Sequence, residues 1–181
     1  MKLTRRAGIA GISLSAAAIL ATTAALATTA ASAAPSRPAT PSCTSGAMRV
    51  WTGEPGDAAA GHTFWQLEIS NIGHHACTLF GYPGVSLVNN SGHQVGLPAS
   101  HSGPRALVTL APGGTAHVVL SIADPFIVCA HPVHGSMLKV FAPNQFHAEI
   151  TPFSVSVCPH KVTMHVDAVH PGAGIPGFSA S

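Results

Sequence analysis

The chain has 181 residues, of which 8% are charged and 46% are hydrophobic, and its formal net charge is +2 at pH 7. Three of its eight basic residues lie within the first six positions, so the rest of the chain carries five basic and six acidic residues. This near balance, with no basic patch, argues against nucleic acid and anionic membrane surfaces as partners.

Residues 1–33 have the pattern of a cleaved export signal peptide. Lys2, Arg5 and Arg6 precede a long uncharged run, which ends at the small-x-small cleavage site Ala31-Ser32-Ala33. A retained membrane anchor is the alternative, because the run is long enough to span a bilayer. The cleavage site favours removal, so we expect a secreted, extracellular protein that begins near Ala34 and has no membrane attachment. The Arg5-Arg6 pair leaves the twin-arginine export route open.

Composition divides the exported chain into three parts. Residues 34–42 contain three prolines and are predicted to form a disordered leader. Residues 43–170 are enough for one domain with a substantial core. Residues 171–181 are rich in Gly and Pro and are predicted to form a flexible tail.

Three segments of the domain alternate between apolar and polar residues with a period of two, which is typical of half-buried β-strands. They are residues 63–70, 115–122 and 161–168. In the first of them, Trp65, Leu67 and Ile69 share the face that is expected to be in the core, and Glu68 lies on the polar face. Shorter strands are predicted for residues 47–52, 85–88, 105–110, 137–141 and 153–157.

Turn-forming residues separate these segments. Gly81-Tyr82-Pro83-Gly84, Asn89-Asn90-Ser91-Gly92 and Ala111-Pro112-Gly113-Gly114 predict tight connections. No helical periodicity is present beyond the signal peptide. About eight short strands over this length predict an all-β domain, an immunoglobulin-like sandwich of two sheets, whose strand order stays open.

All four cysteines, Cys43, Cys77, Cys129 and Cys158, lie in the exported part of the chain. An even number of cysteines in an oxidising compartment predicts two disulfides that staple the domain. Three pairings are possible. We favour Cys43 with Cys77 and Cys129 with Cys158, because each bridge then closes a loop of about 30 residues, which the chain-entropy model values at roughly 3–4 kcal/mol.

The order of these features resembles an actinobacterial secreted family called domain of unknown function 4232. The matching residues are Cys43, Gly61-His62, the strand Trp65-x-Leu67-x-Ile69, Asn71-x-Gly73, the block from Cys77 to Leu87, Leu110-x-Pro112-Gly113-Gly114, Cys129 and Cys158. The resemblance covers Cys43 to about Val169, and the block from Cys77 to Leu87 is its most specific part. It implies a β-sandwich in secreted or cell-surface proteins, with paired cysteines and no known catalytic residues.

The main alternative is a copper protein. The chain contains 12 histidines, and histidine is the commonest metal ligand in proteins. Cys129, His134 and Met137 have a spacing that resembles the copper-binding loop of cupredoxins, where a thiolate, an imidazole and a weak axial thioether bind the metal. A second imidazole would come from His62, His74, His75 or His93. Loose capture of zinc or copper by surface histidines is a further alternative.

A copper site at Cys129 would leave three cysteines in an oxidising compartment, so disulfides and the absence of a cofactor remain the preferred prediction. Catalysis has little support either. The six acidic residues include no close pair of the kind that glycosidases use. Ser136 follows His134 closely but lacks a nucleophile-elbow pattern.

The remaining expectations concern exposure. His117 and His165 fall on the polar faces of their strands and are expected to be exposed to solvent. Trp65 is expected in the core, whereas Trp51 and Tyr82, if exposed, are the first candidates for a binding patch, because aromatic residues dominate interface energetics. The sequence therefore predicts a non-catalytic binding or structural module with an unidentified extracellular partner.

Overall fold

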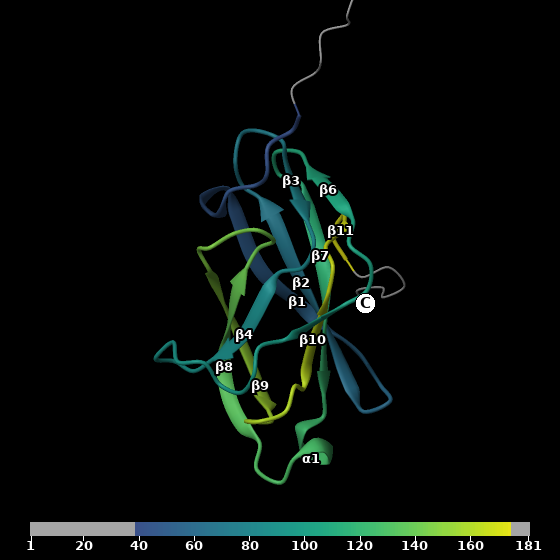
Figure 1. Ribbon diagram of the computed structural model, residues 1–181, viewed down its shortest axis with the longest axis vertical. Helices are drawn as coiled ribbons and strands as arrows, with labels where there is room; N and C mark the ends of the chain where they lie inside the picture. Colours follow the sequence, from purple (N-terminus) through teal and green to yellow (C-terminus); the bar gives the residue numbers. More distant parts are fainter. Residues whose placement is uncertain (1–38, 175–181) are drawn as a thin grey trace, which may run out of the picture. The chain divides into compact units, whose positions relative to one another are not determined.

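The computed structural model describes residues 39–174, so the predicted signal peptide, most of the leader and the last seven residues lie outside the described part. The described chain consists mainly of β-strands (Figure 1). Within it, helical structure is limited to the 3-10 turn η1 (Ser45–Ala47) and the single-turn helix α1 (Pro125–Val128). The prediction of an all-β domain is confirmed at this level.

The largest sheet contains all three of the strongly alternating segments. Its strand order is β1-β2-β7-β10-β5, and β11 also pairs with β7. The strands are β1 (Met48–Ala59), β2 (His62–Asn71), β5 (Ser100–Ser102), β7 (Thr115–Ala123), β10 (Met164–Asp167) and β11 (His170–Pro171). Only β10 and β5 pair in parallel; the other pairs of this sheet are antiparallel.

The remaining strands form two smaller antiparallel sheets. One has the order β4-β8-β9, and the other pairs β3 with β6. Their bounds are β3 (Cys77–Phe80), β4 (Gly84–Val88), β6 (Leu107–Leu110), β8 (Val133–Phe141) and β9 (Glu149–Val157). Residues 39–174 thus contain eleven strands in three hydrogen-bonded sheets, whereas about eight strands in two sheets were expected. β3, β5 and β11 have four residues or fewer, too short to show periodicity.

A single hydrophobic core joins the three sheets. The apolar faces of β2 and β7 supply its centre, where Leu67, Ile69, Val118 and Leu120 have no solvent exposure. The smaller sheets add Leu79, Val108, Leu87, Leu138, Val140 and Phe153. The alternation in residues 63–70 and 115–122 therefore predicted both the strands and the faces that they bury.

The last predicted strand is shorter than residues 161–168, because β10 begins at Met164. Its partner β7 ends at Ala123, and Asp124 then caps α1, so the residues before Thr163 have no neighbouring strand. Val162, which lies in the predicted segment but before β10, is 43% exposed for this reason.

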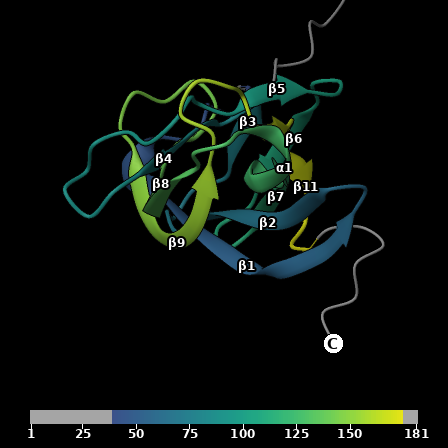
Figure 2. The same cartoon turned by 90° about the horizontal axis from the view of Figure 1, so that it is seen from below.

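Two disulfides cross-link segments of the domain that lie 34 and 29 residues apart in the sequence. Cys43 is bonded to Cys77 and Cys129 to Cys158, which is the sequential pairing that loop length favours. Cys77 begins β3 and Cys129 follows α1, and these two elements lie toward opposite ends of the domain in Figure 1. Figure 2 views the domain from below, so the end that carries α1 faces the reader.

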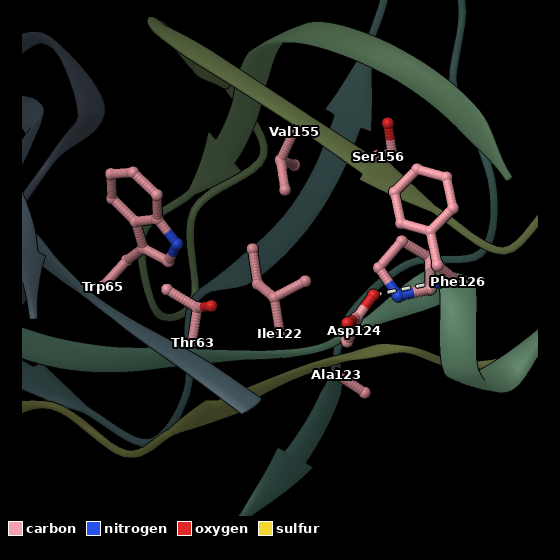
Figure 3. Close-up of a pocket in the computed structure, with 9 residues that line it drawn as sticks. Thr63, Trp65, Ile122, Ala123, Asp124, Phe126, Val155 and Ser156 are labelled. Atoms are coloured by element: carbon pink, nitrogen blue, oxygen red, sulfur yellow. Dashed lines mark hydrogen bonds between the residues drawn. The ribbon is translucent and has the colours of Figure 1, made fainter. Parts of the chain in front are cut away.

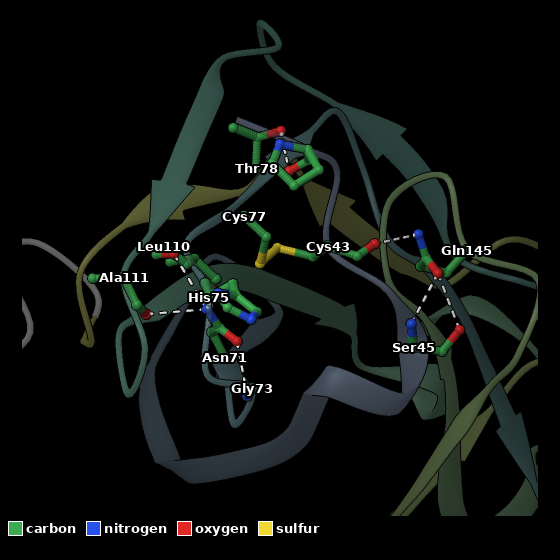
Figure 4. Close-up of a disulfide and its surroundings, with 11 residues drawn as sticks. Cys43, Ser45, Asn71, Gly73, His75, Cys77, Thr78, Leu110, Ala111 and Gln145 are labelled. Carbon is green, nitrogen blue, oxygen red and sulfur yellow. Dashed lines mark hydrogen bonds between the residues drawn. A yellow bond between two sulfur atoms is a disulfide. The ribbon is translucent and has the colours of Figure 1, made fainter. Parts of the chain in front are cut away.

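The end of the predicted leader is attached to the domain beside the first disulfide (Figure 4). The N–H of Thr78 donates a hydrogen bond to the carbonyl oxygen of Pro41 (2.8 Å), and Ser42 forms a parallel bridge with Thr78. Cys43 is 1% exposed, so the staple is buried where the chain enters the domain.

Candidate functional site

A cleft of about 240 Å³ opens at the end of the domain that carries α1 (Figure 3). It lies between the large sheet and β9. β2 contributes Thr63 and Trp65 to its lining, β7 contributes Ile122, β9 contributes Val155, and the turn that begins α1 contributes Asp124 and Phe126. Three segments that are far apart in the sequence thus form one concave surface.

Trp65 forms the inner wall of this cleft. Its ring packs edge-on against Phe153, with ring centroids 4.7 Å apart and an interplanar angle of 75°. The indole nitrogen points toward the space between Thr63, Ile122 and Val155 (Figure 3) and has no hydrogen-bond partner. A buried donor without a partner costs about 1–3 kcal/mol.

The α1 turn forms the outer rim and presents two large apolar side chains to solvent. Phe126 is 75% exposed and Ile127 is 77% exposed. The turn is fixed at its start because the Asp124 carboxylate accepts a hydrogen bond from the Phe126 N–H (3.0 Å) and Pro125 occupies the first helical turn. At its end, Cys129 is bonded to Cys158. Both ends of the turn are thus attached to the domain, and the two apolar side chains between them are exposed, as at many interaction surfaces.

Asp124 is the one charged residue among those that line the cleft. It also borders a second hollow of about 200 Å³, which the loop between β1 and β2 lines from the other side. A negative charge thus lies where the two hollows meet, and the other side chains that line the cleft are apolar apart from the hydroxyls of Thr63 and Ser156 and the indole N–H of Trp65.

Sequence reasoning missed the rim of this site. Trp65 was expected in the core and is instead half-buried, packing on the core with one edge and lining the cleft with another. Asp124, Phe126 and Ile127 were not singled out, because a helix of four residues shows no periodicity. The signal that could have found α1 is Asp124 followed by Pro125, an N-cap residue with proline at the first helical position.

The copper alternative does not assemble. The sulfur atom of Cys129 is bonded to Cys158 and is not a thiolate ligand. The ring nitrogens of His134 lie 3.3 Å from the Ser154 hydroxyl and 3.4 Å from the Ser156 hydroxyl, while Met137 lies further along β8. Across residues 39–174, no group of three or more His, Cys, Asp or Glu side chains is placed to hold a metal ion.

Of the four histidines considered as a second copper ligand, His74, His75 and His93 are exposed. His62 is half-buried, and its Nδ1 lies 3.0 Å from the hydroxyl oxygen of Ser121.

Trp51 and Tyr82, the candidates for an aromatic patch, do not line the cleft. Trp51 is 42% exposed on β1, and its indole N–H donates to the Ser70 hydroxyl (3.3 Å). Tyr82 stacks on His101 with ring centroids 4.7 Å apart, and the Arg105 guanidinium lies 5.5 Å from the Tyr82 ring. The polar partners of both rings come from the domain itself.

The expected exposure of His117 is wrong, because this side chain is 1% exposed. The segment after β11 covers it, and its Nδ1 lies 2.9 Å from the carbonyl oxygen of Gly172. His165 is half-buried, with its Nδ1 2.6 Å from the Ser100 hydroxyl. Alternation placed both histidines on the correct face of the sheet but could not show what lies over that face.

Comparison with known proteins gives the class of the domain. A family model described as "Domain of unknown function (DUF4232)" matches residues 43–168, so the chain belongs to this family. Searches of curated proteins and of solved structures found no match. None of the helices described in residues 39–174 has the length and apolar character that a membrane crossing requires.

Proposed function

We propose that this protein is a secreted, non-catalytic binding module with an immunoglobulin-like sandwich fold, and that its binding site is the cleft between β2, β7 and β9. The observation that carries the proposal is the half-buried Trp65, whose ring lines an apolar cleft beside the exposed Phe126 and whose indole N–H has no partner within residues 39–174. An extracellular location is supported by the export-signal pattern and by the two disulfides, which persist in oxidising compartments.

The dimensions of the cleft favour a polypeptide partner. At about 240 Å³ it is smaller than the roughly 300–1,000 Å³ of pockets that enclose drug-sized ligands, and it suits a single protruding side chain. Phe126 at the cleft and its neighbour Ile127 expose further apolar surface for such a partner to contact. A side chain that fills a pocket within a ring of apolar contacts is the usual centre of a protein interface.

The polar groups of the cleft define the chemistry of the partner. The Trp65 N–H is covered by the side chains around it, and we expect them to shift on binding so that the main-chain carbonyl of a bound peptide supplies the missing acceptor. Asp124, the one charge among the lining residues, disfavours an anionic side chain. The partner side chain is therefore apolar, aromatic or cationic. An aromatic ring would pack against Trp65, and a cation would also contact its face.

Binding is favoured over catalysis because the reactive groups near the cleft are not organised. Ser156 lies at the cleft, 3.4 Å from His134 Nδ1. The other ring nitrogen of His134 lies near the Ser154 hydroxyl at 3.3 Å, and within residues 39–174 no carboxylate is hydrogen-bonded to the ring as in a hydrolase triad.

The test follows the indole N–H resonance of Trp65 by NMR, in a Trp51→Phe variant that leaves Trp65 as the single tryptophan. The probes are the N-acetyl amides of phenylalanine, arginine and glutamate. The phenylalanine and arginine compounds are expected to shift this resonance saturably with millimolar affinity, and the glutamate compound much less. Absence of a saturable shift with all three would overturn the proposal.

Two substitutions of exposed phenylalanines locate the site. Phe126→Ala removes the rim of the cleft, whereas Phe146→Ala removes a side chain that is 91% exposed and does not line it. We expect the first to weaken the response of Trp65 at least severalfold and the second to leave it unchanged. Equal effects of the two variants would place the binding elsewhere.

A further inference from the structure

The end of the described chain, from β11 to Gly174, is held on the large sheet by two buried side chains. We call these residues, 170–174, the C-terminal strap. His170 pairs with His117 and Pro171 with Ala116 on β7. Beyond this pairing, Gly172 accepts a hydrogen bond from His117 Nδ1 (2.9 Å), and the Gly174 N–H donates one to Glu68 Oε1 (3.0 Å). The first residues of the predicted flexible tail are thus anchored to the domain.

The strap buries two ionisable residues. Glu68 has no solvent exposure and His117 is 1% exposed. They are directly paired across β2 and β7, so both side chains lie on the same outer face of the sheet. The polar face predicted for residues 63–70 is therefore correct for Glu68, but solvent does not reach it because the strap lies over it.

Neither residue has all its hydrogen bonds satisfied. Glu68 Oε2 and His117 Nε2 are buried and have no partner. The carbonyl oxygen of Gly172 can only accept, so His117 Nδ1 carries the hydrogen of their bond. An ionised carboxylate in this position loses most of its hydration and receives a single hydrogen bond from the strap, which is an unfavourable exchange.

The charged and titratable groups around Glu68 do not neutralise it with an ion pair. They come from β7 (His117), β11 (His170), β10 (Asp167) and β1 (Arg49). His170 stacks on the His117 ring at 5.5 Å and binds Asp167 through its Nε2 (3.0 Å). Asp167 also accepts a hydrogen bond from the Val119 N–H (2.7 Å). Arg49 pairs with Ser70 on the same face but forms no ion pair with Glu68.

Burial raises the pKa of Glu68 above its ordinary value of 4.5. The Gly174 hydrogen bond and the nearby His117 lower this pKa, but their combined effect is smaller than that of burial. Proton binding and strap closure are therefore coupled, because the closed strap keeps water from the carboxyl group.

We propose that the C-terminal strap is a pH-sensitive latch, closed over Glu68 and His117 while Glu68 is protonated and released as Glu68 ionises. The closed state holds the proton more tightly than an open state in which water reaches the carboxyl group. The pKa of Glu68 is therefore higher in the closed state than in the open state. At pH values between these two pKa values the closed state binds more protons, so a rise in pH through this range shifts the strap toward the open state.

The composition of the strap suits it for opening. Gly172-Ala173-Gly174 has almost no apolar side chain to pack, so hydrogen bonds supply most of its attachment. Segments with few buried apolar contacts open at low free-energy cost. Gly172 and Gly174 have φ angles of +84° and +91°, a backbone conformation that other residues rarely adopt. Release uncovers Glu68, His117 and the outer face of β2 and β7.

The experiment measures hydrogen exchange and the chemical shift of the Gly174 amide by NMR between pH 4 and pH 8. After correction for intrinsic base catalysis, the protection factor is expected to fall about tenfold for each pKa unit that separates the closed and open states. The amide shift should follow the same curve, since its acceptor is the titrating carboxylate. Protection that stays constant across the titration of Glu68 would overturn the latch.

Glu68→Gln removes the ionisable group of this side chain and keeps its shape. Glutamine keeps an acceptor for Gly174 and does not ionise, so the variant is expected to keep the strap closed without pH dependence. Glu149→Gln, which removes a carboxylate on β9, is the matched control and should retain the wild-type profile. A Glu68→Gln variant that kept the wild-type profile would also overturn the proposal.

Gly172→Ala opens the strap by a different route. The added Cβ has no atom within 4 Å, so its effect comes from strain at a positive φ. Gly92→Ala has the same open surroundings and a φ of +78° but lies in the turn after β4, and it is the control. We expect the first variant to return the Glu68 titration toward that of an exposed carboxyl. An unchanged titration would show that the strap does not cause the burial, and the proposal would fail.

Discussion

The side chain of Asn71 accepts a hydrogen bond from the N–H of Gly73 (2.9 Å) and thereby closes the turn after β2. Its Nδ2 donates to the carbonyl oxygens of His75 (2.9 Å), Leu110 (3.3 Å) and Ala111 (3.2 Å), as Figure 4 shows. The side chain is fully buried and joins the turn between β2 and β3 to the turn between β6 and β7. This bonding is the physical basis of the Asn71-x-Gly73 motif.

Asn71→Ala is expected to destabilise the domain by about 2–4 kcal/mol. It leaves the N–H of Gly73 and up to three carbonyl oxygens without a hydrogen-bond partner where these two turns meet. The free energy of unfolding from urea titration measures this loss. Asn90→Ala is the control: the side chain of this exposed residue accepts one hydrogen bond, from the Ser136 hydroxyl, among residues 39–174. This variant should lose less than about 1 kcal/mol of stability. If Asn71→Ala lowered the free energy of unfolding as little as the control does, the stabilising role of the Asn71 hydrogen bonds would be contradicted.

Gly135→Ala is expected to disrupt packing between β8 and β4. An added Cβ would lie 2.3 Å from Leu87 Cγ and 2.7 Å from Leu87 Cδ2, and Leu87 has no solvent exposure. Overpacking of this kind costs about 1–3 kcal/mol or more. Gly46→Ala, where no atom lies within 4 Å of the added Cβ, is the control.

A double-mutant cycle tests the cause of this loss. Leu87→Ala creates a cavity and is itself destabilising, by about 2–5 kcal/mol. It also makes room for the methyl group at position 135, so the double variant should lose less stability than the sum of the two single variants. Additive losses would show that contact with Leu87 is not the cause.

How far the fold could be predicted depends on the length of each element. β2 and β7 alternate over eight residues or more, so their position and buried faces followed from the sequence. β5 and β11 consist of three and two residues, and they exist because β10 and β7 offer free edges beside them. Such strands are fixed by their partners in space and leave no local signal.

The candidate site could not be predicted from the sequence, because residues from distant parts of the chain form it only in the folded domain. Its lining comes from β2, the start of α1 and β9, which are separated by about 30 to 60 residues of chain. Local patterning placed Trp65 on the core-facing side but could not show that Phe153 covers one edge of the ring and leaves another at the cleft. His117 was misjudged for the same reason, since its cover comes from Gly172, 55 residues away.

The disulfide between Cys129 and Cys158 predicts a definite result in a thiol assay. Protein purified without reductant, stripped of metal, denatured and alkylated should take up no label, and its intact mass should lie four hydrogens below that of the reduced chain. Replacing both cysteines of this bridge with serine should lower the free energy of unfolding by about 3–4 kcal/mol, given a sequence separation of 29 residues. Alkylation at Cys129 in this unreduced protein would restore the copper alternative.

The raised pKa of Glu68 also predicts how global stability changes with pH. The unfolded chain titrates this residue near 4.5, and the folded protein titrates it higher, so the folded state binds more protons between the two values. The stability that protonated Glu68 contributes is present below pH 4.5 and is lost as the pH rises through the folded pKa. Urea titrations from pH 4 to pH 8 should therefore show wild-type protein losing stability relative to Glu68→Gln. A difference that stayed constant, or that grew in favour of the wild type, would mean that the folded protein does not disfavour ionised Glu68.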